Sequence, residues 1–199
     1  MIRSNGRILK WQHTPNKGDS DEVVRIKRIA YKKWSLMIER LTSEKYLEYV
    51  PTYKLCSCSE LWKSYDNFYE DFIQIPFHHV KEYHFDKDIL FKNNKVYEAG
   101  KCSMIPPRIN SLIYRPKAYN RDLPHGVTRD FHNENMYIAA VYKNGRNHTV
   151  ARTTDLYEAF NAYKQAKELI IKEVAIEYKD RISNDVFNAL YNWSVEFDD

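Results

Sequence analysis

Apolar residues recur at spacings of three and four in two stretches of the N-terminal half, which is the pattern of one buried helix face. The first stretch runs from Asp21 to Leu41, and the second, rich in aromatic residues, runs from Ser59 to Ile73 and stops before Pro76. Lysine and arginine lie mostly off the first stripe. The pattern predicts two amphipathic helices, of which the first has a basic face that is either solvated or laid against a phosphate backbone.

The pattern changes to an alternation of apolar and polar residues near Phe85. Two short runs, 85–90 and 96–97, flank a polar turn at Asn93 and Asn94, and two prolines then lead into a helical stretch at 108–112. Alternation is typical of strands, and proline is tolerated in the first turn of a helix. We therefore expect a β-hairpin made of the two runs, followed by a helix.

Three more strands and a long helix are predicted in the C-terminal half. The first strand begins at Gly126, the second alternates around Ala139, and the third covers 148–153 after a tight turn at Asn144 and Gly145. Asp155 is placed to cap the helix that follows. The apolar stripe of this helix consists of Leu156, Ala159, Tyr163, Ala166, Ile170 and Val174.

These elements predict an α+β protein of two modules. We expect a basic N-terminal arm over 1–20, a ββα module with flanking helices over 21–116, and a three-stranded antiparallel sheet packed on one helix over 117–180. A short helix and an acidic tail follow at 181–199. A chain of 199 residues is long enough to bury the cores of two small domains.

The formal net charge of +4 hides an uneven distribution. Residues 168–199 hold 8 acidic and 3 basic side chains, whereas residues 101–154 hold 9 basic and 3 acidic ones. A basic body attracts polyanions through counterion release, which makes nucleic acid the first partner to consider. An ordinary lysine-rich surface is the alternative.

No apolar run approaches the roughly 20 residues that a membrane helix needs. The first residues lack the apolar core of a signal peptide, and three cysteines are an odd number for a disulfide framework. We therefore expect a soluble protein of a reducing cytoplasm with no membrane partner.

The three cysteines leave two interpretations open. Cys56, Cys58 and Cys102, with one of His78, His79 or His84, would supply the four ligands of a zinc site. Three ordinary reduced thiols explain the same residues.

The ordered series of motifs resembles a phage-type HNH homing endonuclease fused to an APETALA2-type DNA-binding domain. The HNH-like text is FDKDIL from Phe85, NKVY from Asn94, and the pair Ile109 and Asn110. The APETALA2-like text includes NGR from Asn144 and DLYEAF from Asp155. The resemblance covers most of residues 30 to 195 and implies a double-stranded DNA partner and, for a phage protein, the host cytoplasm.

The resemblance also implies a cleavage chemistry, in which a magnesium or manganese ion stabilises charge on a phosphodiester while a histidine activates water. It assigns Asp86, Asp88 and Asn110 to the metal, with Asp86 and Asn110 catalytic. His84 would share a strand face with Asp86 and is the best substitute base; a histidine satisfied by a hydrogen bond is the alternative.

Two lysines depart from the HNH pattern. Lys87 and Lys101 stand where a histidine and an asparagine are expected, and ammonium groups beside a cation site repel the cation. These departures favour DNA binding without cleavage.

In APETALA2-type domains the sheet lies in the DNA major groove, where arginines reach guanine edges. Arg129 or Arg152 could instead form surface ion pairs. Three functions stay open: a nicking endonuclease, an inactive DNA-binding regulator, and a phage protein that binds a host protein with this scaffold. The candidate DNA-binding residues are Arg129, Tyr137, Lys143, Arg146 and Arg152, with Lys87 and Lys101.

Overall fold

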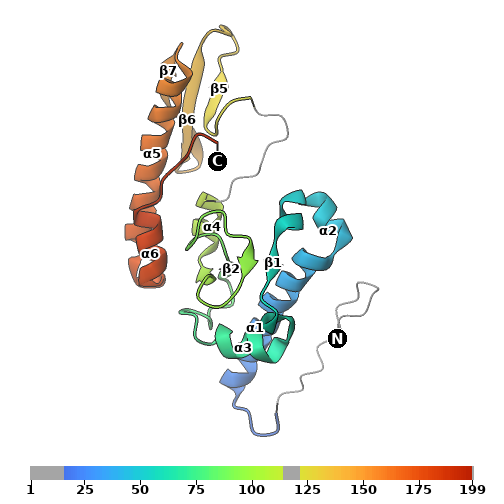
Figure 1. Cartoon of the computed structure of the whole chain (residues 1–199). Coiled ribbons are helices and arrows are strands. Elements are labelled where there is room, and N and C mark those ends of the chain that lie inside the picture. Colours follow the sequence, from blue (N-terminus) through green and yellow to red (C-terminus); the bar gives the residue numbers. More distant parts are fainter. Residues whose placement is uncertain (1–15, 114–121, 199) are drawn as a thin grey trace. The chain divides into compact units, whose positions relative to one another are not determined.

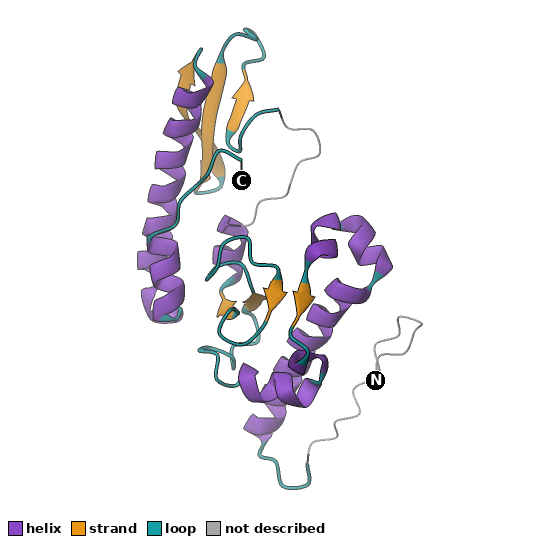
Figure 2. Cartoon of the chain, viewed as in Figure 1, coloured by secondary structure: helices purple, strands orange, loops and turns teal. Residues whose placement is uncertain are grey.

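The computed structural model describes residues 16–113 and 122–198. The chain divides into an N-terminal unit, residues 1–110 with 181–186, and a C-terminal unit, residues 111–180 with 187–199. Helices and strands occur in both, so the predicted α+β class is confirmed (Figures 1 and 2). Most of the arm predicted over 1–20, and the predicted boundary at 116, lie outside the described residues.

The N-terminal unit begins with helix α1 (Asp21–Thr42), where the Ser20 side chain accepts the Val23 N–H as an N-cap. The predicted first helix is confirmed. The aromatic stretch that follows is divided, because Ser64 is extended and separates a short 3-10 turn from α3. The elements after α1 are α2 (Glu44–Tyr49), η1 (Pro51–Leu55), β1 (Ser57–Cys58), η2 (Leu61–Lys63) and α3 (Tyr65–Phe72).

An aromatic core holds these elements together. Met37 of α1 is buried with Trp62, Phe68 and Phe72, which are fully inaccessible to solvent. The Trp62 indole donates to the Asp71 carboxylate at 2.7 Å, which ties η2 to α3. Burying aromatic side chains of this size is the main stabilisation that this unit can obtain.

The strand pairing of the N-terminal unit differs from the predicted hairpin. β2 (His84–Asp86) pairs antiparallel with β4 (Ser103–Ile105), which leads into α4 (Pro107–Ile113). β3 (Val96–Tyr97), predicted as the second strand of the hairpin, instead pairs in parallel with β1. The prediction was wrong because β2 ends at Asp86, in a turn that the alternation of the sequence does not indicate.

The C-terminal unit contains the predicted three-stranded antiparallel sheet and long helix. β5 (Val127–Arg129), β6 (Tyr137–Lys143) and β7 (Arg146–Thr153) pair in that order, and α5 (Leu156–Glu177) packs against them (Figure 1). The Asp155 side chain caps α5 by accepting the backbone N–H groups of Tyr157 and Glu158. Beyond α5 come η3 (Lys179–Arg181) and α6 (Asn184–Tyr191), the predicted short helix.

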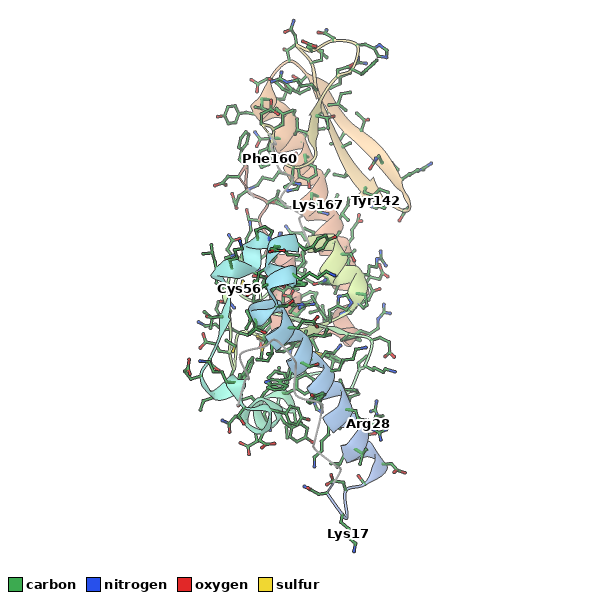
Figure 3. The ribbon with its side chains drawn as sticks, turned by 90° about the vertical axis from the view of Figure 1, so that its right-hand side faces the viewer. Lys17, Arg28, Cys56, Tyr142, Phe160 and Lys167 are labelled. Carbon is green, nitrogen blue, oxygen red and sulfur yellow. The ribbon has the colours of Figure 1, made fainter. Side chains whose placement is uncertain are left out.

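One face of this sheet forms the core with α5. Val127, Ala139 and Val141 are buried against Phe160 and Tyr163 of the helix. Figure 3 labels Phe160 on the helix and Tyr142 on the sheet, and Tyr142 is exposed. Over residues 16–113 and 122–198, the structure contains no helix that is both long and apolar enough to cross a bilayer.

Candidate nucleic-acid interface

Asp86 closes the turn that ends β2. One of its carboxylate oxygens accepts the backbone N–H of Asp88 at 2.9 Å and that of Ile89 at 2.8 Å. Burial raises the pKa of Asp86, whereas the two N–H donors act in the opposite direction. The carboxylate therefore has a structural task in the segment where the sequence predicted a metal ligand.

Lys87 is a buried lysine, with only 4% of its surface exposed. Its ammonium donates to both carboxylate oxygens of Asp88 at 2.7 and 2.8 Å and to the carbonyl of Asn94 at 2.8 Å. The rings of Tyr53 and Tyr97 lie with their centroids 5.8 Å from the same nitrogen. Lys87 is thus an internal cation that holds the loop after β2, and it is not on the surface where a DNA contact was predicted.

These contacts decide how well the predicted donor set suits a divalent cation. Asp88 is committed to the Lys87 ammonium, and one oxygen of Asp86 is committed to the backbone. A second cation beside Asp88 would be repelled by that ammonium. In the part of the chain that the structure describes, no three His, Cys, Asp or Glu side chains gather as metal ligands do. The ion pair of Asp88 with Lys87 thus argues against magnesium or manganese at the set of Asp86, Asp88 and Asn110.

The remaining predicted residues of this unit lie around the same two strands. His84 faces the same side of β2 as Asp86, because side chains alternate along a strand. Partial burial lowers the pKa of His84, and the positive charges of Lys33 and Arg40 act in the same direction. Asn110 is partly buried in α4. The Lys101 ammonium forms an ion pair with Glu98 at 2.6 Å, so it is engaged within the chain.

Of the two interpretations that the sequence leaves open for the cysteines, the described residues do not favour zinc, since they contain no cluster of three or more such ligands. Cys56 and Cys58 are partly buried and Cys102 is buried. Burial raises the pKa of all three thiols, to about 12 for Cys102. The protonated thiol is therefore the favoured form at neutral pH, as expected for ordinary reduced cysteines.

The state of Asp86 leads to a pH prediction. Because its pKa is raised in the folded protein, ionisation opposes folding, and this cost is present at pH 7.5 and disappears as pH falls below about 4. Asp86→Asn keeps an oxygen for the two N–H groups, so it is expected to be as stable as the wild type or more stable at pH 7.5, with the difference shrinking at pH 4. Asp86→Ala is expected to lose about 1–2 kcal/mol of unfolding free energy. Urea denaturation at both pH values measures this, and an Asn variant destabilised as much as the Ala variant would contradict it.

The C-terminal sheet offers a different kind of surface, because α5 covers only the face that carries Ala139 and Val141. Strand residues that alternate with the core positions point away from the helix. We call this side the outer face. It comprises Thr128, Ile138, Ala140, Tyr142, Asn147, Thr149 and Arg152.

A β-bulge determines which arginine reaches the outer face. Ala139 pairs with Ala151 but Ala140 pairs with Thr149, so Val150 is the extra, unpaired residue in β7. A shift of one residue moves side chains to the opposite side of a sheet. Arg152 consequently lies on the outer face, whereas Arg146, opposite Lys143, falls on the helix side.

Arg152 is held in place by an acidic partner. Its guanidinium forms an ion pair with Asp130, which follows β5 and is only 4% exposed. The Asp130 carboxylate also accepts the His132 N–H at 2.8 Å, and this bond, then Arg152, lowers the pKa of Asp130. The arginine side chain itself remains 55% exposed. One guanidinium nitrogen is therefore held by Asp130, while more than half of the side chain stays open to solvent.

The other predicted contacts are directed elsewhere. Arg129 lies over the ring of Tyr137, 5.3 Å from its centroid, and both belong to the helix side of the sheet by alternation. Lys143 forms an ion pair with Glu173 of α5 at 2.6 Å. The structure therefore brings one of the five predicted sheet residues, Arg152, to the outer face.

The net positive charge of the chain comes from residues outside the described ranges. Residues 122–198 contain 9 Lys and Arg against 12 Asp and Glu, and residues 16–113 contain 16 against 14. The excess of positive charge comes from residues 1–15 and 114–121, each with three basic and no acidic side chains. The C-terminal unit, residues 111–180 with 187–199, contains 11 basic and 12 acidic side chains in total, so any preference for a polyanion must come from how its charges are arranged.

No protein-family model matches this chain, and neither a curated protein nor a solved structure matches it significantly. The resemblance to HNH and APETALA2 proteins stays a prediction. The residue that sequence reasoning missed is Asp130: an acidic residue at the end of a short strand gives no signal of its own, and its role depends on the cross-sheet position of Arg152.

Proposed function

We propose that this chain binds double-stranded DNA through the outer face of the β5-β6-β7 sheet, in the manner of an APETALA2-like reader. The observation that carries the proposal is Arg152, exposed on that face and fixed by the buried Asp130. The other outer-face side chains are neutral, and Asn147, Thr149 and Tyr142 offer hydrogen-bonding groups. Groups of this kind suit base edges and phosphates.

The dimensions support the same function. β6 has seven residues, so the face is roughly 20 Å long, and three strands span roughly 10 Å. A major groove is about 12 Å wide and admits a small sheet. The face thus covers about six base pairs along the groove.

The anchored guanidinium suggests how sequence is read. An arginine donates two parallel hydrogen bonds to the O6 and N7 atoms of guanine, and each such pair contributes about 1–3 kcal/mol of discrimination. The Asp130 carboxylate restricts Arg152 before DNA arrives, which lowers the entropy lost on binding. We infer that Arg152 is the residue that selects a guanine.

We further propose that the N-terminal unit, HNH-like in its order of two strands and a helix, supports binding without metal-dependent cleavage. The support is the chemistry of Lys87, whose ammonium occupies the position beside Asp88 that a cation would need. Supercoiled plasmid incubated with the protein and magnesium or manganese is expected to stay intact. Nicking that is lost in both Asp86→Ala and Asn110→Ala would contradict this part of the proposal.

DNA binding itself is tested by fluorescence anisotropy with a 24-base-pair duplex at increasing salt. The logarithm of the association constant is expected to fall linearly with the logarithm of the salt concentration, as counterions are released. A protein that shows no affinity for duplex DNA, together with salt-insensitive binding to a protein partner, would contradict the proposal and favour the host-protein alternative.

A further inference from the structure

The loop between β5 and β6 presents an unusually exposed aromatic side chain. Phe131 is 93% exposed, more than any other large apolar side chain in the described ranges. Its ring meets the ring of His132 edge to face, with centroids 5.2 Å apart. A phenylalanine left in water forgoes the stabilisation that burial would bring, so a partner that covers this ring would gain it.

The loop that carries Phe131 is closed by its own hydrogen bonds. The Asp130 N–H donates to the Met136 carbonyl at 2.8 Å, and the Met136 N–H donates to the Asn133 carbonyl at 2.9 Å. The Asn135 N–H donates to the Asn133 side chain at 3.1 Å. The loop that carries the exposed ring is therefore held in one conformation, so little conformational entropy of the loop would be lost on binding.

Phe131 and Arg152 share one anchor. Asp130, directly before Phe131, accepts the His132 N–H and pairs with Arg152. Arg129, the last residue of β5, pairs with Tyr137, the first residue of β6, and Tyr137 pairs with Thr153 at the end of β7. The loop between β5 and β6 therefore lies at the end of the sheet that carries Arg152, opposite the end with the Asn144 turn. A ligand that touches Arg152 would lie close to the exposed ring.

We propose that Phe131 inserts between stacked bases of the duplex bound on the outer face, opening one base step next to the base contacted by Arg152. This inference rests on the proposed DNA binding. Apolar side chains that enter a base step unstack it and bend the duplex, and every base offers a face for an aromatic ring.

The surroundings of the ring favour a nucleic acid over a protein partner. Residues that anchor protein interfaces lie in the middle of an apolar, water-excluding patch. Phe131 is instead followed by His132, Asn133, Glu134 and Asn135, all exposed polar residues, and preceded by Asp130, which pairs with the Arg152 guanidinium. A single apolar wedge among polar groups is the arrangement that a base step requires.

Two 24-base-pair duplexes of one sequence test the inference, one fully paired and one with a central T·T mismatch, each with 2-aminopurine beside the centre. A mismatch reduces the free energy needed to unstack the step. The wild type is expected to bind the mismatched duplex roughly tenfold more tightly and to raise the 2-aminopurine fluorescence. Phe131→Ala is expected to lose both effects, and Phe131→Trp to keep them.

The outcomes separate this inference from the function on which it rests. Because Phe131 is exposed, the alanine variant should fold, and its circular dichroism serves as the control. Two results would contradict insertion of Phe131 while leaving DNA binding supported. The first is salt-dependent binding with no preference for the mismatched duplex and no change in fluorescence. The second is a mismatch preference that is unchanged in Phe131→Ala. Absence of binding to either duplex overturns both, and leaves a protein as the partner that covers Phe131.

Discussion

Replacing Gly126 with alanine is expected to destabilise the C-terminal unit by more than about 3 kcal/mol. Gly126 has a φ of +77°, and a Cβ added there would lie 2.0 Å from a ring carbon of Tyr163. Tyr163 belongs to α5 and is buried in the core of this unit, so moving its ring aside would disturb the packing of that core. Strain in the backbone and overlap with the core act together at this position.

Gly145→Ala is the matched control for this substitution. Gly145 has a similar φ of +81°, but no atom lies within 4 Å of the added Cβ. Only the backbone penalty applies, so the expected loss is about 1 kcal/mol. Urea denaturation, with amide exchange of residues 127–153 as a local probe, measures both. Equal losses in the two variants would show that the packing of Tyr163 on Gly126 contributes nothing.

Replacing Lys87 with methionine is expected to destabilise the N-terminal unit by about 2–4 kcal/mol. The substitution keeps an apolar side chain beside the Tyr53 and Tyr97 rings, but leaves the Asn94 carbonyl without its donor and Asp88 without its cation. Asp88 is 43% exposed and regains some hydration, which holds the loss below that of a fully buried pair.

Lys95→Met provides the comparison for Lys87, because Lys95 is an exposed lysine in the same loop. Its removal is expected to change the unfolding free energy by less than about 0.5 kcal/mol. Chemical denaturation of both variants in parallel is the measurement. A Lys87 variant as stable as the wild type would mean that the ammonium is not an internal tie, and would reopen the site beside Asp88 to a metal ion.

Much of the fold could be predicted from the sequence, because a long periodic pattern of apolar residues is compatible with only one type of secondary structure. The stripe from Val23 to Leu41 gave α1, and the alternation around Ala139 with the Asn144 and Gly145 turn gave the β6-β7 hairpin. The second strand of the N-terminal pair was misassigned, since a turn closed by Asp86 and a buried Lys87 leave no periodic trace.

The candidate site was harder to predict, and one residue explains why. A regular strand from Arg146 to Arg152 would place both arginines on the same face. The bulge at Val150 separates them, and bulges have no reliable sequence signal in a run such as this one. The ion pairs of Lys143 with Glu173 and of Arg152 with Asp130 likewise depend on positions far apart in the chain.

Whether DNA binds on the outer face is tested by the affinities of Arg152→Ala and Arg146→Ala for a duplex that the wild type selects from a random-sequence pool. Both are exposed arginines of β7, and they differ in the face that the bulge gives them. Arg152→Ala is expected to lose about 1–3 kcal/mol, roughly 5- to 150-fold in affinity, whereas Arg146→Ala should stay within about threefold of the wild type. Equal losses, or a larger loss in Arg146→Ala, would contradict DNA binding on the outer face.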